Sequence, residues 1–268
     1  MQYWFKTMTA AAITCSALTP VTAQYTDSTG KAILATDTVS RRVNWNTPVA
    51  NNAFPVKSFI IPAALISYGL TSLGYHSLKD INENIRQEVA IEHPHHRLSI
   101  DNYLQYAPAL AVYGLNAAGI HGKHNFKDRT ILYGMSMLIS NSAVFSIKKF
   151  SGEQRPDESD FFSFPSGHTA NAFVAAEFMR QEYKDKSSWY GVAGYAIAVT
   201  TGYLRMYNNK HWFSDVVAGA GVGIASTRLA YWLYPVLQRG LFKNKRPNTV
   251  IMPTYQQGAV GLGFVHKF

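Results

Sequence analysis

Three short clusters of polar residues could together bind and transfer a phosphoryl group. Such a group spreads negative charge over its oxygens during transfer, so a catalyst needs several fixed donors around it and a nucleophile placed in line. The sequence offers both kinds of group. The clusters are Lys148 with Arg155; Pro165, Ser166, Gly167 and His168; and Arg205 with His211 and Asp215.

The cationic residues of these clusters are suited to holding phosphate oxygens. Arginine presents a planar fork that can bind two oxygens, and lysine adds a mobile point charge, so Lys148, Arg155 and Arg205 are predicted to form a cradle. The tetrad around Ser166 predicts a turn that opens a helix from about Thr169, whose first amides would face an anion. Ser166 could add a hydroxyl donor there or merely cap the helix, and the tetrad alone does not decide between them.

His211 and Asp215 have the spacing of a histidine held by a carboxylate. If a helix starts at or before His211, residues four apart lie on one face, one turn from each other. With Nδ1 bonded to Asp215, the Nε2 lone pair of His211 would be free to attack phosphorus. The same pair taken alone is more often structural, so the interpretation depends on the other clusters.

Together the three clusters resemble the signature of the type 2 phosphatidic acid phosphatase superfamily, which includes class A acid phosphatases and vanadium-dependent haloperoxidases. That signature is Lys, six residues, Arg-Pro; then Pro-Ser-Gly-His; then Ser-Arg, five residues, His, three residues, Asp. The spacings recur from Lys148 to Arg155-Pro156, through the tetrad, and from Arg205 to Asp215. Leu204 stands where the family usually has serine, which puts one minor phosphate contact in doubt.

The resemblance implies a role for each matching residue. His211 would be the nucleophile that becomes phosphohistidine, Asp215 would orient it, and His168 would protonate the leaving oxygen and then activate water. No metal or other cofactor is required by this set. The phosphate ligands implied by the resemblance are Lys148, Arg155, Ser166, Gly167 and Arg205.

Apolar periodicity predicts the elements that position these residues. The pattern is typical of an all-α bundle of about six core helices, resembling the acid phosphatase and haloperoxidase fold, either soluble or embedded in a membrane. An amphipathic helix is predicted in addition over residues 78–89. The six apolar stretches are 58–75, 103–120, 129–147, 168–182, 189–206 and 214–237.

Both ends of the chain lie outside this phosphatase domain, which we place at residues 58–238. Residues 1–23 have the pattern of a signal peptide, with an uncleaved anchor helix as the alternative, and 24–57 form a polar leader. The only cysteine, Cys15, lies in the first segment, so the processed chain would form no disulfide. Residues 239–268 combine a basic joint with an alternating pattern that predicts a short strand or hairpin.

The charge pattern indicates an anionic partner without identifying it. The formal net charge is +9, but no stripe of basic residues interleaved with aromatics supports nucleic acid. The run His93-Pro94-His95-His96 could bind a metal, yet no Cys or carboxylate pattern completes a site, and a solvated loop is favoured.

The sequence therefore predicts a phosphatase of the bacterial envelope that acts on monoesters or diphosphates of lipids. Apolar helices near the clusters favour a lipid substrate and a membrane, whereas Glu177, Arg180 and Arg228 inside apolar stretches favour a soluble periplasmic acid phosphatase. A vanadium haloperoxidase and a catalytically inactive binding module are the remaining alternatives.

The distribution of basic residues predicts an active site that faces the periplasm. Six spans would place all three clusters on one side, with the joints containing Lys123 and Lys186 inside. A cleaved signal followed by six spans gives the opposite orientation. The preferred resolution is that 58–75, with its internal Pro62, lies on or beside the bilayer, and an uncleaved anchor as first crossing gives the same site orientation.

Overall fold

The computed structural model describes residues 24–26, 32–34, 54–92, 96–242, 249–256 and 259–266. Residues 1–23, including Cys15, and residues 93–95 of the histidine run lie outside it, so the signal and the metal alternative are not tested there. Contacts divide the chain into Met1–Asn51 and Asn52–Phe268. Each is described by itself.

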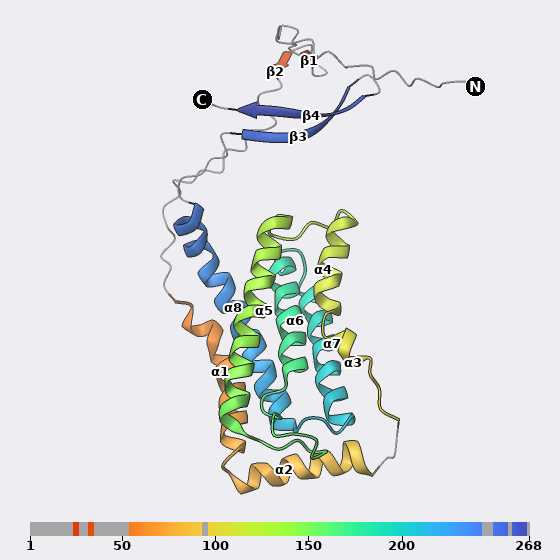
Figure 1. Cartoon of the computed structure of the whole chain (residues 1–268), viewed down its shortest axis with the longest axis vertical. Helices are drawn as coiled ribbons and strands as arrows, with labels where there is room; N and C mark the ends of the chain where they lie inside the picture. Colours follow the sequence, from red (N-terminus) through yellow and green to blue (C-terminus); the bar gives the residue numbers. More distant parts are fainter. Residues whose placement is uncertain are drawn as a thin grey trace, which may run out of the picture. The chain divides into compact units, whose positions relative to one another are not determined.

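The described body of the chain is a helical bundle, which confirms the predicted fold class. Helices α5 to α8 run alongside one another, and α2 lies across one end of them (Figure 1). The helices are α1 (Val56–Ser72), α2 (His76–Arg86), η1 (Gln87–Ile91, π-helical), α3 (Asp101–Leu104), α4 (Ala107–Ala117), α5 (Phe126–Ser151), α6 (Gly167–Tyr183), α7 (Ser188–Tyr207) and α8 (Phe213–Phe242).

Helix α6 is the central element of the bundle. It packs against α4, α5, α7 and α8, and most of its side chains are buried. Val174 and Phe178 are completely inaccessible to solvent. A helix enclosed on all sides needs apolar or small residues around its whole circumference, and the alanine-rich sequence of α6 provides them.

Two glycines let α8 approach the first turns of α6 at backbone distance. A Cβ added at Gly219 would lie 2.6 Å from the carbonyl oxygen of Ser166, closer than real Cβ atoms come. One added at Gly223, one turn further along α8, would clash with the backbone of Ala170 and Val174. The glycines therefore allow the two backbones to pack directly against each other.

Helix α5 is longer than its apolar stretch, because local signals outside that stretch fix both of its ends. Asn125 caps the start by accepting a hydrogen bond from the Asp128 amide at 2.9 Å. Gly152, with φ of 57°, ends the helix in the left-handed conformation that glycine adopts without strain. The amphipathic segment likewise forms α2, followed by the π-helical turn η1.

Short strands flank the helical body in the sequence. In the first unit, β1 (Gln24–Thr26) pairs antiparallel with β2 (Ala32–Leu34), within the segment expected to be a polar leader. In the tail, β3 (Thr249–Gln256) pairs antiparallel with β4 (Ala259–His266), with Thr249 opposite His266. The alternating residues of the tail thus lie in a hairpin.

Two helices of the described residues are long and apolar enough to cross a membrane: Phe126–Ser151 of α5 and Phe213–Gln238 of α8. The pair formed by α1 and α2 with η1, which bends by 96°, brings the number to three if it acts as one broken span. Pro62 lies within α1, which packs along α8.

Candidate active site

His211 and Asp215 meet at the start of α8, although not in the way that their spacing predicts. Helix α8 begins at Phe213, so His211 belongs to the preceding turn and not to the helix. Asp215, in the first helical turn, nevertheless accepts a hydrogen bond from the Trp212 amide at 3.0 Å. This fold of the chain brings His211 Nδ1 to 3.2 Å from Asp215 Oδ2, with both side chains buried.

A third residue, Ser163, completes the support of the carboxylate. Its hydroxyl, which is inaccessible to solvent, donates to Asp215 Oδ2 at 2.5 Å. The Ser166 amide also donates to the Asp215 backbone carbonyl at 3.0 Å, which joins the start of α6 to the start of α8. Three donors therefore converge on one carboxylate oxygen and fix the orientation of the imidazole.

The tetrad opens α6 as predicted, but two residues earlier, at Gly167. Ser166 caps the helix: its Oγ lies 3.4 Å from the Thr169 amide and 2.9 Å from the Thr169 hydroxyl. Its own hydroxyl hydrogen remains available to an oxyanion. A Cβ at Gly167 would touch only Val144, at 3.7 Å, so packing within the protein does not require glycine at this position.

The short helix α3 supplies partners for two of the predicted residues. Asp101 Oδ2 accepts a hydrogen bond from Arg205 Nη1 at 2.6 Å, and both side chains are buried. The neighbouring Asn102 places its Oδ1 2.9 Å from His168 Nε2. The α3 segment therefore contacts both Arg205, a predicted phosphate ligand, and His168, the predicted proton donor.

Lys148 and Arg155 are held by the loop that joins α5 to α6. Lys148 Nζ donates to the carbonyl oxygens of Phe162, at 2.5 Å, and Ser163, at 3.0 Å. Arg155 Nε donates to Asp160 Oδ1 at 2.7 Å. Both cations are thus fixed by loop residues that lie next in sequence to the tetrad.

The cations and the two histidines form one electrostatic unit. Burial and the positive charges of Lys148, Arg205 and Arg155 hold the pKa of His211 well below its usual range. Burial, with Arg205 as the next cause, lowers the pKa of His168 to about 4. All three cations therefore lower the pKa of both histidines. Both imidazoles are neutral near pH 7 before an anion binds.

Sequence reasoning missed Ser163, Asp101 and Asn102. Ser163 lies three residues before Ser166, where position next to the motif was the only signal. Asp101 and Asn102 lie more than 60 residues upstream of the motif residues that they contact. Their sequence context is an ordinary helix start, so nothing in it indicates a partner so distant along the chain.

A comparison with protein-family models finds a match over part of the chain. The model described as the PAP2 superfamily matches residues 129–239. That range contains every residue predicted above to bind or transfer phosphate, from Lys148 to Asp215. This part of the chain is similar to the PAP2 superfamily. The resemblance of its three clusters to type 2 phosphatidic acid phosphatases is therefore confirmed.

Individual PAP2 relatives match parts of the chain. The lipid A 1-phosphatase of Porphyromonas gingivalis is 35% identical over 161 residues, which are 60% of this chain and 36% of that protein. The chain therefore spans little more than a third of the length of that curated relative.

Two solved structures are similar as well. The LpxE structure from Aquifex aeolicus has a TM-score of 0.44 and 21% identity, and it covers 56% of this chain and 94% of its own. The transmembrane PAP2 type phosphatidylglycerolphosphate phosphatase from Bacillus subtilis has a TM-score of 0.45 and 22% identity, covering 70% and 98%.

Proposed function

We propose that this chain is a phosphatase that hydrolyses a phosphate monoester or diphosphate of an envelope lipid through a phosphohistidine at His211. The observation that carries the proposal is the hydrogen bond between His211 Nδ1 and Asp215 Oδ2, at 3.2 Å. With Nδ1 engaged, Nε2 keeps its lone pair for attack, and the carboxylate stabilises the positive charge that develops on the ring.

In the first step, His211 Nε2 attacks phosphorus and the bond from phosphorus to the leaving oxygen breaks. The leaving oxygen takes a proton from His168. Lys148, Arg155 and Arg205 stabilise the charge on the equatorial oxygens, together with the amides at the start of α6. Arg155 exchanges its contact with Asp160 for the phosphate in this scheme.

In the second step, a water molecule attacks phosphorus, the bond to Nε2 breaks and inorganic phosphate leaves. His168 accepts the proton from this water. The lowered pKa of His168 in the free site is compatible with its role as acid, because a bound phosphate dianion favours the protonated imidazole. Both histidines thus start neutral, and substrate binding charges the donor.

A lipid substrate is favoured over a small soluble one by three observations. The relative that is 35% identical is named a lipid A 1-phosphatase. Helices α5 and α8, which flank the site, are long and apolar enough to cross a membrane. Near the site, Phe161 and Phe162 are exposed on the α5–α6 loop, where acyl chains could lie against them. We place the site on the periplasmic side.

Trapping of the intermediate tests the mechanism. The His168→Ala variant is incubated with a ³²P-labelled aryl phosphate that has a good leaving group. We expect ³²P to accumulate on the protein, and we expect this label to be stable in alkali and lost in acid, as for a phosphohistidine. His211→Ala serves as the matched control and is expected to carry no label and to show no turnover. Full turnover by His211→Ala would refute the assignment of the nucleophile.

A competition between substrates tests the lipid assignment. Phosphate release is measured from a lipid phosphomonoester in mixed micelles and from a soluble aryl phosphate, each with the same preparation. A higher kcat/KM for the lipid is expected. A higher kcat/KM for the aryl phosphate would instead indicate a broad-specificity acid phosphatase.

A further inference from the structure

A second polar site lies at the other end of the bundle from His211. A cavity of about 680 Å³ opens there between α4, the joint after α4 and the start of α5. Helix α6 has 17 residues, with the proposed active site at its first turn and this cavity beside its last. At 1.5 Å per residue the two sites are separated by roughly 24 Å along the helix axis.

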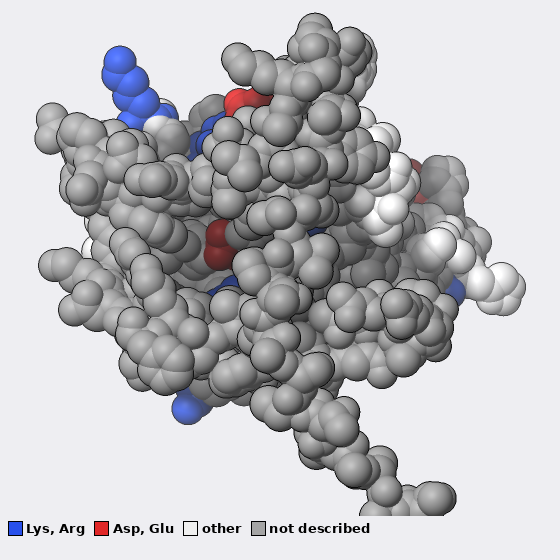
Figure 2. Space-filling model, turned by 90° about the horizontal axis from the view of Figure 1, so that it is seen from above, with Lys and Arg blue, Asp and Glu red and all other residues white. Residues whose placement is uncertain are grey.

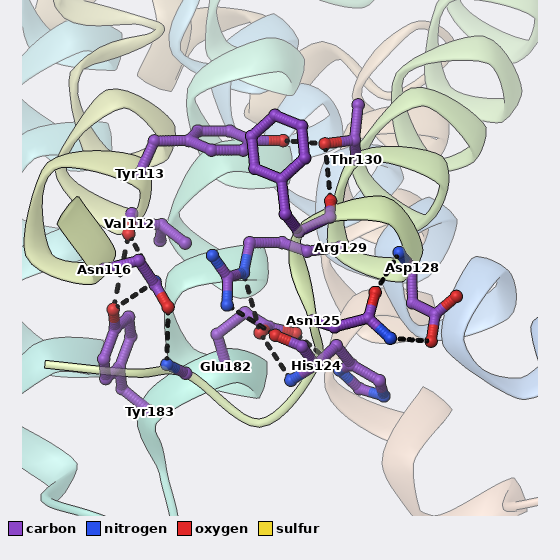
Figure 3. Close-up of polar contacts among 12 residues, drawn as sticks. Val112, Tyr113, Asn116, His124, Asn125, Asp128, Arg129, Thr130, Glu182 and Tyr183 are labelled. Carbon is purple, nitrogen blue, oxygen red and sulfur yellow. Dashed lines mark hydrogen bonds and ion pairs between the residues drawn. The ribbon is translucent and has the colours of Figure 1, made fainter. Parts of the chain in front are cut away.

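A hydrogen-bond network fixes the floor of this cavity (Figure 3). The Gly122 amide donates to Asn116 Oδ1 at 2.9 Å, and Asn116 Nδ2 in turn lies 2.6 Å from the Tyr183 hydroxyl. A Cβ at Gly122 would lie 2.8 Å from Glu182 Oε2, so glycine allows the joint to pass close to that carboxylate. The joint that lines the cavity is therefore held by contacts with α4 and α6.

The buried carboxylate behind the cavity is fully engaged. Glu182 accepts hydrogen bonds from the ring and the amide of His124, at 2.7 and 3.1 Å, from Arg129 Nε at 3.3 Å and from the Tyr231 hydroxyl at 2.7 Å. Burial opposes its ionisation, but these donors outweigh burial and hold the pKa of Glu182 below its usual range. Glu182 thus balances the charge of Arg129.

The lining of the cavity remains cationic after this pair is balanced. Its basic lining residues are His121, Lys123, His124 and Arg129, and no carboxylate lines it. Lys123 and His121 are exposed, so both side chains can turn toward a ligand. Asp128, the nearest acid in the sequence, accepts from the Tyr234 hydroxyl at 2.6 Å and does not line the cavity.

Figure 2 views the molecule from above and shows described Lys and Arg side chains in blue, and Asp and Glu side chains in red, at separate points. Helix α5 begins at the cavity and, with 26 residues, extends about 39 Å, close to the thickness of a bilayer with its headgroups. If α5 crosses the membrane, its first turn lies at the interface opposite the active site. Basic pockets at that depth are suited to lipid headgroups.

We propose that this cavity binds the phosphate of an anionic phospholipid in the leaflet opposite the active site. Lys123, His121 and the outer edge of Arg129 would hold the headgroup. An aromatic wall formed by Tyr113 and Phe126, whose rings are 5.9 Å apart, would lie against the glycerol and the upper acyl chains. Phe126 is 72% exposed, and Leu110 on α4 is 67% exposed, which favours a lipid over a free anion.

The test measures lipid binding and not turnover. The full chain in detergent is titrated with phosphatidylglycerol, and the bound fraction is read by native mass spectrometry. Lys123→Ala is expected to bind about fivefold more weakly, since one basic residue contributes about 1 kcal/mol to attraction of an anionic lipid surface. The matched control is Lys186→Ala, which removes an exposed charge from the α6–α7 joint at the same end and is expected to bind as wild type.

Further arms identify the ligand. Lys123→Arg is expected to keep wild-type affinity, and glycerol phosphate at the same concentration is expected not to displace the lipid. The proposal would be overturned if Lys123→Ala and Lys186→Ala lost phosphatidylglycerol binding equally, or if neither lost it. It would also be overturned if glycerol phosphate displaced the lipid, or if phosphatidylcholine bound equally well. All variants keep the residues of the active site, so this result is independent of whether the chain is a phosphatase.

Discussion

Replacing Asp101 by Asn tests whether α3 belongs to the active site. The side chain of Asp101 is 1% exposed and that of Arg205 is 5% exposed, and their contact is 2.6 Å. Asn has nearly the same size but carries no charge. The substitution therefore leaves Arg205 without its counter-charge and removes the negative group that favours protonation of His168.

The structure sets the size of both effects. Breaking a buried ion pair costs about 3–5 kcal/mol, and Asn retains an acceptor oxygen, so we expect a loss of about 3 kcal/mol in unfolding free energy. Asp101 raises the pKa of His168, which burial and Arg205 lower to about 4. Its removal lowers this pKa further, and each unit reduces the protonated fraction about tenfold at pH 6.

The assay compares leaving groups in the wild type, Asp101→Asn and Asp185→Asn, an exposed control on the α6–α7 joint. A proton donor contributes about 10²–10⁴-fold and matters least when the leaving group needs no proton. We expect kcat for an alkyl phosphate to fall at least about tenfold more than kcat for p-nitrophenyl phosphate. Equal losses on both substrates would refute the link between Asp101 and proton donation.

Four further predictions follow from the site. Ser163→Ala should lower kcat by about 10–100-fold, because a buried hydrogen bond to a carboxylate contributes about 1.5–3 kcal/mol; Ser163→Thr keeps the hydroxyl and is its control. Vanadate should inhibit and chelators should not, and activity restored by a divalent ion after chelation would contradict this. Because the pKa of His211 is lowered, its neutral form persists as the pH falls. After correction for substrate ionisation, kcat/KM should therefore begin to fall on the acid side only below about pH 6.5. In a cysteine-free background, Ser159→Cys should react with an impermeant thiol reagent in intact cells and Lys186→Cys should not, whereas labelling of Lys186→Cys alone would refute a periplasmic site.

The helices could be predicted from the sequence because burial imposes a period on apolar residues. Five of the six apolar stretches each correspond to one helix, whereas the stretch 103–120 covers the end of α3 and the whole of α4. The segment predicted to be amphipathic is α2 with η1. The ends were less predictable, since capping residues such as Asn125 and not apolar periodicity determine them. The contact between His211 and Asp215 was anticipated with the wrong local geometry, because spacing cannot distinguish a helix from the turn before it.

The supporting residues of the site could not be predicted, for a physical reason. The motif residues can be found by their fixed spacing along the chain. Asp101, Asn102 and Ser163 have no such spacing, and only their contacts in the folded structure connect them to the motif residues. The distance between α3 and the motif along the chain hides this contact. The cavity beside Glu182 was not predicted either: its lining residues all lie within residues 113–129, but contacts with Glu182 and Tyr183, far along the chain, hold that stretch in place.

The close packing of α8 on α6 has a consequence for the geometry of the proposed active site. Because Gly219 and Gly223 bring backbone against backbone, the turn carrying His211 and the turn carrying His168 are rigidly coupled. We therefore expect side-chain changes elsewhere in the core to have little effect on the separation of His211, the proposed nucleophile, and His168, the proposed proton donor. We expect differences in the leaving group to be accommodated by the α5–α6 loop and α3, which hold Lys148, Arg205 and His168 through hydrogen bonds.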